Sequence, residues 1–480
     1  MTEQSLKDKT AKGLFWGGLS SGTQQIINVI FGIFFARILT QADYGLLAPL
    51  SFFTGLVALI QDSGFTAALI NKPKIKHEDY NAVFWFSLFV GIITYIILFF
   101  CAPFIAAYFN APELEKASRV MFLWFLIGGA TTAHNAMLMK KIMVKERAKI
   151  LLFTLVISNG IGLFAAISGF NYWALVIQTV LHSVFGTILT WYYSPWRPTF
   201  TFNMNPLKDM LPFSIKLLFT GFFSVINNNI FFILLGRFYS REEQGDFSQA
   251  NKWSILGYSF INTMLAGIVH PILAEIANDV ERQRNVFRKL LRFVSFVSFP
   301  CLFGLAFVSK ELIMVTVGEK WLPCVPIMQL LCIWGAFVPI SSLYSSLFIS
   351  RGKSNINMWN IVGLGILQLI IAIIMLPYGI KNMVAANVLI NLLWLFIIQF
   401  FAWKTIRLQF SDVLKDIVPF AFIISAIIML TYLLTNTLNN VYLLLLSKII
   451  LVAGLYIFVM KISNAVVFKE SLEYLLKRRQ

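Results

Sequence analysis

Three ionisable side chains interrupt stretches that are otherwise apolar, and they are the residues best placed to do chemistry in this sequence. Lys216 and Lys252 each stand inside such a stretch, and Asp62 opens the segment Asp62-Ser-Gly-Phe near the end of another. A charge near the centre of a bilayer costs at least about 2.5–3.5 kcal/mol, so it is expected to face a bundle interior or a wet cavity. Ammonium groups there would suit an anion. The carboxylate would suit a coupling cation, although a helix cap or hinge is an equal alternative.

Uncharged polar side chains gather on two further stretches. Gln24 and Asn28 lie in one of them, and Asn228 is the middle residue of an Asn-Asn-Asn run in the other. These groups would suit a hydrated cleft, whereas the alternative is hydrogen bonding between helices, worth about 0.6 kcal/mol each. The predicted binding residues are Lys252 first and Lys216 second, joined by the three amides, and Asp62 is the predicted ion-coupling residue.

Other polar residues in the apolar stretches have a simpler interpretation. Lys216 and Arg119 could also extend to a membrane surface, because long side chains reach the interface from one turn inside. The histidines His134, His182 and His270 are more often packed groups than proton carriers, and Lys448 lies outside the expected substrate path. No zinc-protease or nucleotide-binding motif occurs, and the four cysteines form no Cys-x-x-Cys pair. The sequence predicts a protein that is not an enzyme, with no metal and no cofactor.

The composition indicates whether these groups lie in a soluble protein or in a membrane protein. The chain has 480 residues, of which 58% are hydrophobic and 13% charged, and its mean hydropathy is +0.76. A soluble chain has about 25% charged residues, so this chain is predicted to be an all-α polytopic membrane protein. Its net charge of +17 lies largely in short loops. There it indicates topology rather than binding to nucleic acid.

Apolar runs of about 20 residues are long enough to cross a membrane as helices. Fourteen runs qualify, and no connection between them leaves room for a soluble domain. They cover approximately residues 14–36, 43–66, 82–107, 116–138, 150–168, 172–193, 211–236, 244–269, 290–309, 324–349, 357–377, 381–402, 414–435 and 440–461.

The lysines and arginines predict the orientation of these spans. With the N-terminus inside, the cytoplasmic segments contain most of the 39 basic residues, including Lys140, Lys141, Lys145, Arg147 and Lys149. Cytoplasmic loops carry such an excess in membrane proteins. Both termini are therefore expected in the cytoplasm.

One turn motif occurs twice, two hundred residues apart. Arg37 to Gly45 and Arg237 to Gly245 both follow Arg-x-x-[Thr/Ser]-x-x-[Asp/Glu]-x-Gly. The hydroxyl and the acid three residues later predict a capping box at each turn. Six predicted spans separate the copies, so the halves are expected to be parallel repeats. We expect six-helix bundles at 1–200 and 201–405, with two extra helices and a tail at 406–480.

Several motifs resemble a known family. The opening Thr10-Ala-Lys-Gly-Leu-Phe-Trp-Gly, the turn from Arg37, and Asp62-Ser-Gly-Phe-Thr-Ala-Ala-Leu-Ile look like polysaccharide and lipopolysaccharide exporters. Gly318-Glu-Lys-Trp-Leu-Pro-Cys-Val-Pro and Ser350-Arg-Gly-Lys-Ser do so too. The likeness covers essentially the whole chain. It is strongest to the Wzx-type flippases of the multidrug/oligosaccharidyl-lipid/polysaccharide exporter superfamily, in particular the colanic acid exporter branch.

The resemblance implies two six-helix bundles around a central cavity, plus two peripheral helices. It implies that an undecaprenyl-pyrophosphate-linked oligosaccharide is flipped across the bacterial inner membrane, with cavity cations meeting the pyrophosphate. Membrane lipids, and also a polysaccharide polymerase and a chain-length regulator, are the implied partners. The alternative is a drug or cation antiporter of the same superfamily, which would favour a buried carboxylate. A membrane glycosyltransferase would need a larger outer loop than any present here.

Overall fold

The computed structural model describes residues 22–62, 65–72, 75–201, 203–266, 268–463, 465 and 467–469. It describes their side chains except at residues 61, 62, 67, 68, 71, 209–214, 216, 217 and 266. The predicted first span begins at residue 14, so its opening residues lie outside the described part of the chain.

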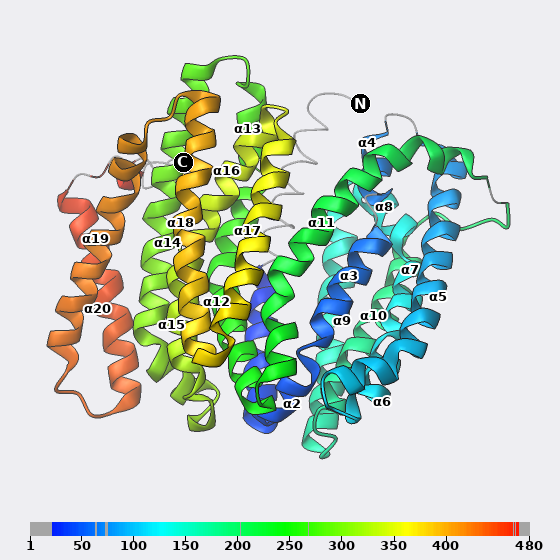
Figure 1. Ribbon diagram of the computed structural model, residues 1–480, viewed down its shortest axis with the longest axis horizontal. Helices are drawn as coiled ribbons and strands as arrows, with labels where there is room; N and C mark the ends of the chain where they lie inside the picture. The colour runs from blue at the N-terminus through cyan, green and yellow to red at the C-terminus, as the bar shows by residue number, and fades with distance from the viewer. Residues whose placement is uncertain are drawn as a thin grey trace. The chain divides into compact units, whose positions relative to one another are not determined.

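The described secondary structure is helical throughout (Figure 1). Within the described residues, twelve helical segments are long and apolar enough to cross a membrane, three of them joining two of the helices named below, and a shorter apolar helix covers Gly22–Ile38. This confirms an all-α polytopic membrane protein. The helices that follow the first are α2 (Gln41–Leu47), α3 (Leu50–Asp62), α4 (Phe65–Asn71), α5 (His77–Tyr108), α6 (Glu113–Met121), α7 (Leu123–Gly129), α8 (Thr132–Lys140), α9 (Val144–Ile167), α10 (Trp173–Tyr193), α11 (Asn205–Phe238), α12 (Arg241–Ala266), α13 (Val269–Glu275), α14 (Val280–Thr316), α15 (Cys324–Gly335), α16 (Val338–Ser350), α17 (Ser354–Met375), α18 (Ile380–Ile406), α19 (Phe410–Thr435) and α20 (Val441–Ile462), with short 3₁₀ turns at Glu319–Trp321 and Leu376–Tyr378.

The chain divides into two compact units between Gly245 and Asp246. In unit 1, α9 packs along α10, α5 along α6 and α7, and α3 along α11. In unit 2, α14 packs against α15, α19 and α20, and α17 packs along α18. Each unit is therefore a helix bundle with its own buried contacts.

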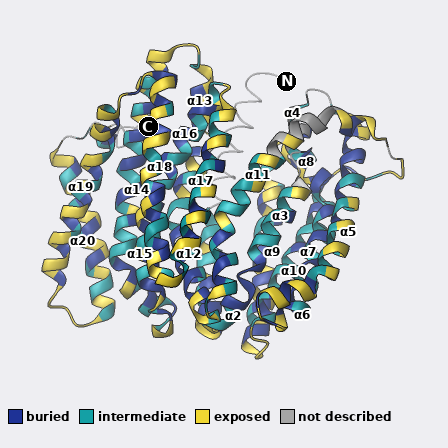
Figure 2. Cartoon of the chain, in the orientation of Figure 1, coloured by how far each residue is buried: buried dark blue, intermediate teal, exposed yellow. Residues whose placement is uncertain are grey.

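Large apolar side chains cover the outer faces of these bundles. Phe104 on α5 is 76% exposed and Phe422 on α19 is 71% exposed, and Phe100 and Ile450 are similarly open. Figure 2 shows exposed residues along α5, α19 and α20, while buried residues follow the faces where helices meet. Apolar surface of this extent on a helix fits contact with lipid rather than with water.

Both copies of the turn motif form the predicted capping box. At the first, Thr40 N donates to Asp43 Oδ2 at 2.8 Å and Asp43 N donates to Thr40 Oγ1 at 3.2 Å. At the second, Ser240 N donates to Glu243 Oε2 at 3.1 Å and Glu243 N donates to Ser240 Oγ at 3.2 Å. Each box satisfies backbone N–H groups that a helix start leaves without a partner.

The last residue of the motif is glycine because the two turns touch through their backbones. A Cβ atom at Gly45 would lie 1.8 Å from the carbonyl oxygen of Arg241, and one at Gly245 would lie 2.1 Å from that of Gln41. The contact is reciprocal, since each glycine meets the residue four positions before the other. No side chain larger than hydrogen fits at this crossing.

The predicted span over residues 116–138 is divided into α6, α7 and α8, with turns at Phe122 and at Ala130–Thr131. Side chains of α10 at intervals of four residues donate to backbone carbonyls of this divided span. Ser183 Oγ donates to Trp124 O, Thr187 Oγ1 to Ile127 O, and Trp191 Nε1 to Ala130 O, at 3.4, 3.4 and 2.9 Å. Irregular backbone at membrane depth is tolerated only where protein buries it or a cavity hydrates it.

One ion pair at the start of α6 has a pH dependence that can be tested. Arg241 donates to both carboxylate oxygens of Glu113, at 3.1 and 2.9 Å, and holds the pKa of that carboxyl below its ordinary value of 4.5. A lowered folded pKa stabilises the fold above the ordinary pKa, and this stability is lost as pH falls through the lowered value. Both side chains are more than a third exposed, so we expect Glu113→Gln to cost at most about 1 kcal/mol at pH 7.

The measurement is thermal unfolding of the purified protein in detergent as a function of pH. The melting temperatures of Glu113→Gln and of the wild type should converge as pH falls below the pKa of Glu113. A constant difference at every pH would contradict the ion-pair origin of the stabilisation.

Candidate functional site

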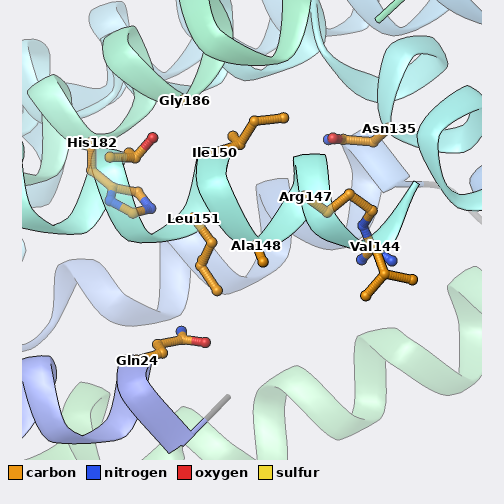
Figure 3. A pocket seen from close by; sticks show the side chains of 10 residues that line it. Gln24, Asn135, Val144, Arg147, Ala148, Ile150, Leu151, His182 and Gly186 are labelled. Atoms are coloured by element: carbon orange, nitrogen blue, oxygen red, sulfur yellow. The ribbon is translucent and has the colours of Figure 1, made fainter. Parts of the chain in front are cut away.

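A partly polar cavity of about 480 Å³ lies inside unit 1. Figure 3 shows Arg147 and Asn135 at one end of it, His182 at the other, and Gln24 reaching it from the helix Gly22–Ile38. Thr154 also lines it, and its hydroxyl is buried without a partner among the described residues. We call this space the arginine cavity. It runs along α9 for about 10 Å, because Arg147 and Thr154 are seven residues apart at 1.5 Å each.

Arg147, unlike Lys140 and Lys149, has no partner among the described residues. Lys140 Nζ donates to the carbonyl oxygens of Ile70 and Lys72, at 2.6 and 2.8 Å, and Lys149 lies over the Tyr193 ring. The exposed guanidinium of Arg147 makes no ion pair or hydrogen bond with any described residue. A cation that lines a cavity without a counter-ion is available to an anionic ligand.

A second cavity, of about 290 Å³, adjoins the first through three residues that line both: Asn135, His182 and Gly186. It lies between α10 and the divided span α6–α8, which we call the broken span. We call it the hydroxyl cavity, because six Ser and Thr residues line it: Thr66, Thr131, Thr132, Ser183, Thr187 and Thr190. Together the two cavities place a cation at one end and neutral hydroxyls at the other.

The three amide residues predicted to bind substrate lie in different surroundings. Gln24 lines the arginine cavity. Asn28, one turn further along the same helix, is half-buried and is not one of the residues lining either cavity. Asn228 is exposed on α11. None of these positions tests a role in binding, so that role stays a prediction.

The predicted charged residues lie elsewhere. Lys252 is half-buried in α12, in unit 2, and makes no ion pair with any described residue. Lys216 lies in α11 and Asp62 ends α3, but the side chains of both fall outside those that the structure describes. Their predicted roles are therefore untested.

Unit 2 contains a buried ion pair that the sequence does not indicate. Lys448 Nζ donates to Glu311 Oε1 at 2.8 Å and lies 4.5 Å from the centre of the Phe307 ring. Glu311 and Lys448 are each more than 90% buried. The pair joins α14 to α20, which gives Lys448 a structural partner. Among the described residues no group of three or more His, Cys, Asp or Glu side chains could hold a metal ion.

Comparison with known structures identifies the class of fold. The chain resembles the structure titled "Lipid II flippase MurJ, inward closed conformation", with a TM-score of 0.77 and 15% identity, over 95% of this chain and 100% of that one. It also resembles an inward-facing multidrug resistance MATE family transporter of the MOP superfamily, with a TM-score of 0.66 and 15% identity, over 82% and 96% of the two chains. The fold is therefore that of these membrane transporters.

Sequence comparison then gives the family. Residues 34–326 match the family described as "Polysaccharide biosynthesis protein", and the chain belongs to that family. The chain is 27% identical to the teichuronic acid biosynthesis protein TuaB of Bacillus subtilis (strain 168), over 73% of each chain. It is 23% identical to the lipopolysaccharide biosynthesis protein WzxC of Escherichia coli (strain K12), over 74% of this chain and 72% of that one.

Proposed function

We propose that the protein flips an undecaprenyl-pyrophosphate-linked oligosaccharide across the bacterial inner membrane by alternating access, for assembly of a surface polysaccharide. The family and the names of the relatives support a role in polysaccharide biosynthesis, and the flippase fold supports movement of a lipid-linked substrate. The single observation that carries the proposal is Arg147, which has no partner among the described residues and lines a partly polar cavity of about 480 Å³ inside a membrane bundle.

The chemistry of the substrate explains why a cation is needed there. A diphosphate that enters a low-dielectric site loses its hydration, and fixed positive groups must replace the lost water contacts. Arg147 is our first choice for this role in unit 1, and Lys252 and Lys216 are the choices carried over from the sequence. Gln24, Asn28 and Asn228 would donate additional hydrogen bonds to the substrate. Asp62 is the proposed ion-coupling residue.

We also propose the finer topology. It comprises fourteen spans with both termini in the cytoplasm, and parallel six-helix repeats at 1–200 and 201–405 around a central cavity, followed by two helices and a tail at 406–480. The matching capping boxes and the reciprocal contact between Gly45 and Gly245 support the repeat. With this orientation Arg147 stands one turn inside the cytoplasmic start of α9, where a substrate from the cytoplasmic leaflet would meet it first. A polymerase and a chain-length regulator would act on the product.

Reconstituted flipping tests the proposal. In liposomes, the purified protein is expected to expose a fluorescent polyprenyl-diphosphate-linked oligosaccharide to an impermeant reagent, and empty liposomes are not. Lys252→Ala should reduce the rate severely at unchanged protein level, and Lys252→Arg should retain part of it. A protein that moves organic cations against a proton gradient but leaves the lipid-linked sugar in place would instead be an antiporter, and the proposal would be wrong.

A further inference from the structure

We infer that the hydroxyl cavity binds the sugar joined directly to the diphosphate, and that it selects an uncharged hexose. The inference rests on the proposed function, because it adds a specificity site to the same pair of cavities. Among the described side chains, the residues that line this cavity include six hydroxyls and the indole of Trp124, but no lysine, arginine, aspartate or glutamate. A charged sugar would lose its hydration there without gaining a counter-ion.

Three of the six hydroxyl groups that line the cavity can act only as hydrogen-bond acceptors toward a ligand. Thr131 Oγ1, Ser183 Oγ and Thr187 Oγ1 each donate their proton to a backbone carbonyl oxygen of α7, at Gly128, Trp124 and Ile127. Because a hydroxyl has one proton and two lone pairs, these three oxygens can only accept further hydrogen bonds. They offer fixed acceptors to the O–H groups of a ligand.

The remaining polar groups supply donors. Thr66, Thr132 and Thr190 have no side-chain partner among the described residues, and neither does the indole N–H of Trp124 or the amide of Asn135. A sugar hydroxyl both donates and accepts, so a lining that offers both kinds of group matches it. The Trp124 ring adds an apolar surface, as small-molecule sites usually do.

The size and position of the cavity agree with a sugar next to a diphosphate. Its volume of about 290 Å³ has room for about ten waters at roughly 30 Å³ each, enough for one hexose ring with its hydroxyls. Asn135, His182 and Gly186 line both cavities, so a ligand can extend from one to the other. A ligand with an anionic group at Arg147 and a neutral ring in the hydroxyl cavity would have the structure of a sugar diphosphate.

The broken span supplies five of the residues that line this cavity: Trp124, Gly128, Thr131, Thr132 and Asn135. Beyond the turn at Ala130–Thr131, Thr131, Thr132 and Asn135 line the cavity. Transporter sites near the bilayer centre are commonly built from such discontinuous helices.

Binding of two synthetic ligands to the full-length protein in detergent tests the inference. Farnesyl diphosphate and farnesyl diphospho-glucose differ only in the sugar, so their affinity ratio reports what the sugar adds. We expect the sugar to tighten binding to the wild type about tenfold. The double variant Trp124→Phe/Thr190→Val should lose that gain while its affinity for farnesyl diphosphate changes less than twofold. Arg147→Gln should weaken the binding of both ligands.

Thr179→Val is the matched control, because Thr179 lies on α10, donates to Leu175 O at 2.8 Å, and does not line the hydroxyl cavity. It should bind both ligands as the wild type does. If the double variant does not fold, Thr66→Val on α4 tests the same cavity from another helix. Equal affinity of the wild type for the two ligands, or equal losses for both in the double variant, overturns the sugar site but leaves the proposed function standing. If the folded wild type binds neither ligand, the proposed function fails, and the inference fails with it.

Discussion

Replacing Gly45 by alanine is expected to abolish transport and to lower the stability of the protein markedly. The new Cβ atom would lie 1.8 Å from the backbone oxygen of Arg241. A backbone atom cannot move aside as a flexible side chain can, so the two turns must separate. Overpacking usually costs about 1–3 kcal/mol and sometimes more, and here it also displaces the start of α12. The measurements are the melting temperature in detergent and the flipping rate in liposomes.

Gly245→Ala should have the same effect, because its Cβ atom would lie 2.1 Å from the oxygen of Gln41. The two changes strain one crossing, so the double variant is expected to lose less stability than the two single losses combined. Gly160→Ala on α9 is the control, since a Cβ atom there meets nothing within 4 Å. Full additivity of the two changes, or a stable and active Gly45→Ala protein, would show that the backbone contact does not constrain the fold.

The local chemistry of these turns made them predictable from the sequence. A capping box needs only a hydroxyl, an acid three residues later and a helix start, so Thr40 with Asp43 and Ser240 with Glu243 could be recognised without any tertiary information. The spans were predictable for a similar reason, because the hydropathy of about 20 consecutive residues indicates whether a helix lies in lipid or in water. The contact between Gly45 and Gly245 was not predictable, since it joins segments two hundred residues apart.

The candidate site was harder to predict, because its features depend on neighbours distant in sequence. The residues from 116 to 138 are apolar enough to span, and hydropathy does not register that Ser183, Thr187 and Trp191 accommodate breaks in the backbone. The segment Gly128-Gly-Ala-Thr-Thr132 was the available signal, since glycine and β-branched residues weaken a helix. Lys448 and Glu311 pair across 137 positions, which no local pattern reveals.

Arg147 was assigned to a cytoplasmic loop, because four lysines surround it and charge alone does not distinguish it from them. Only the structure separates Arg147 from the engaged cations Lys140 and Lys149. We expect Arg147→Gln to reduce flipping at least about tenfold, since a hydrogen bond to a charged group is worth about 1.5–3 kcal/mol. Arg147→Lys should retain part of the activity, because lysine keeps the charge but loses the bidentate geometry.

Lys149→Gln is the matched control for Arg147→Gln, because it removes the same charge from the same helix two residues later. Lys149 lies over the Tyr193 ring and does not line the arginine cavity, so the Lys149→Gln protein should flip the substrate at close to the wild-type rate. A general loss of positive charge at the membrane surface would slow both variants equally, and raising the salt concentration would then slow the wild type as well. A direct contact to the diphosphate predicts a defect in Arg147→Gln alone. If Arg147→Gln flips normally at wild-type abundance, the arginine cavity is not where the diphosphate binds, and Lys252 becomes the leading candidate.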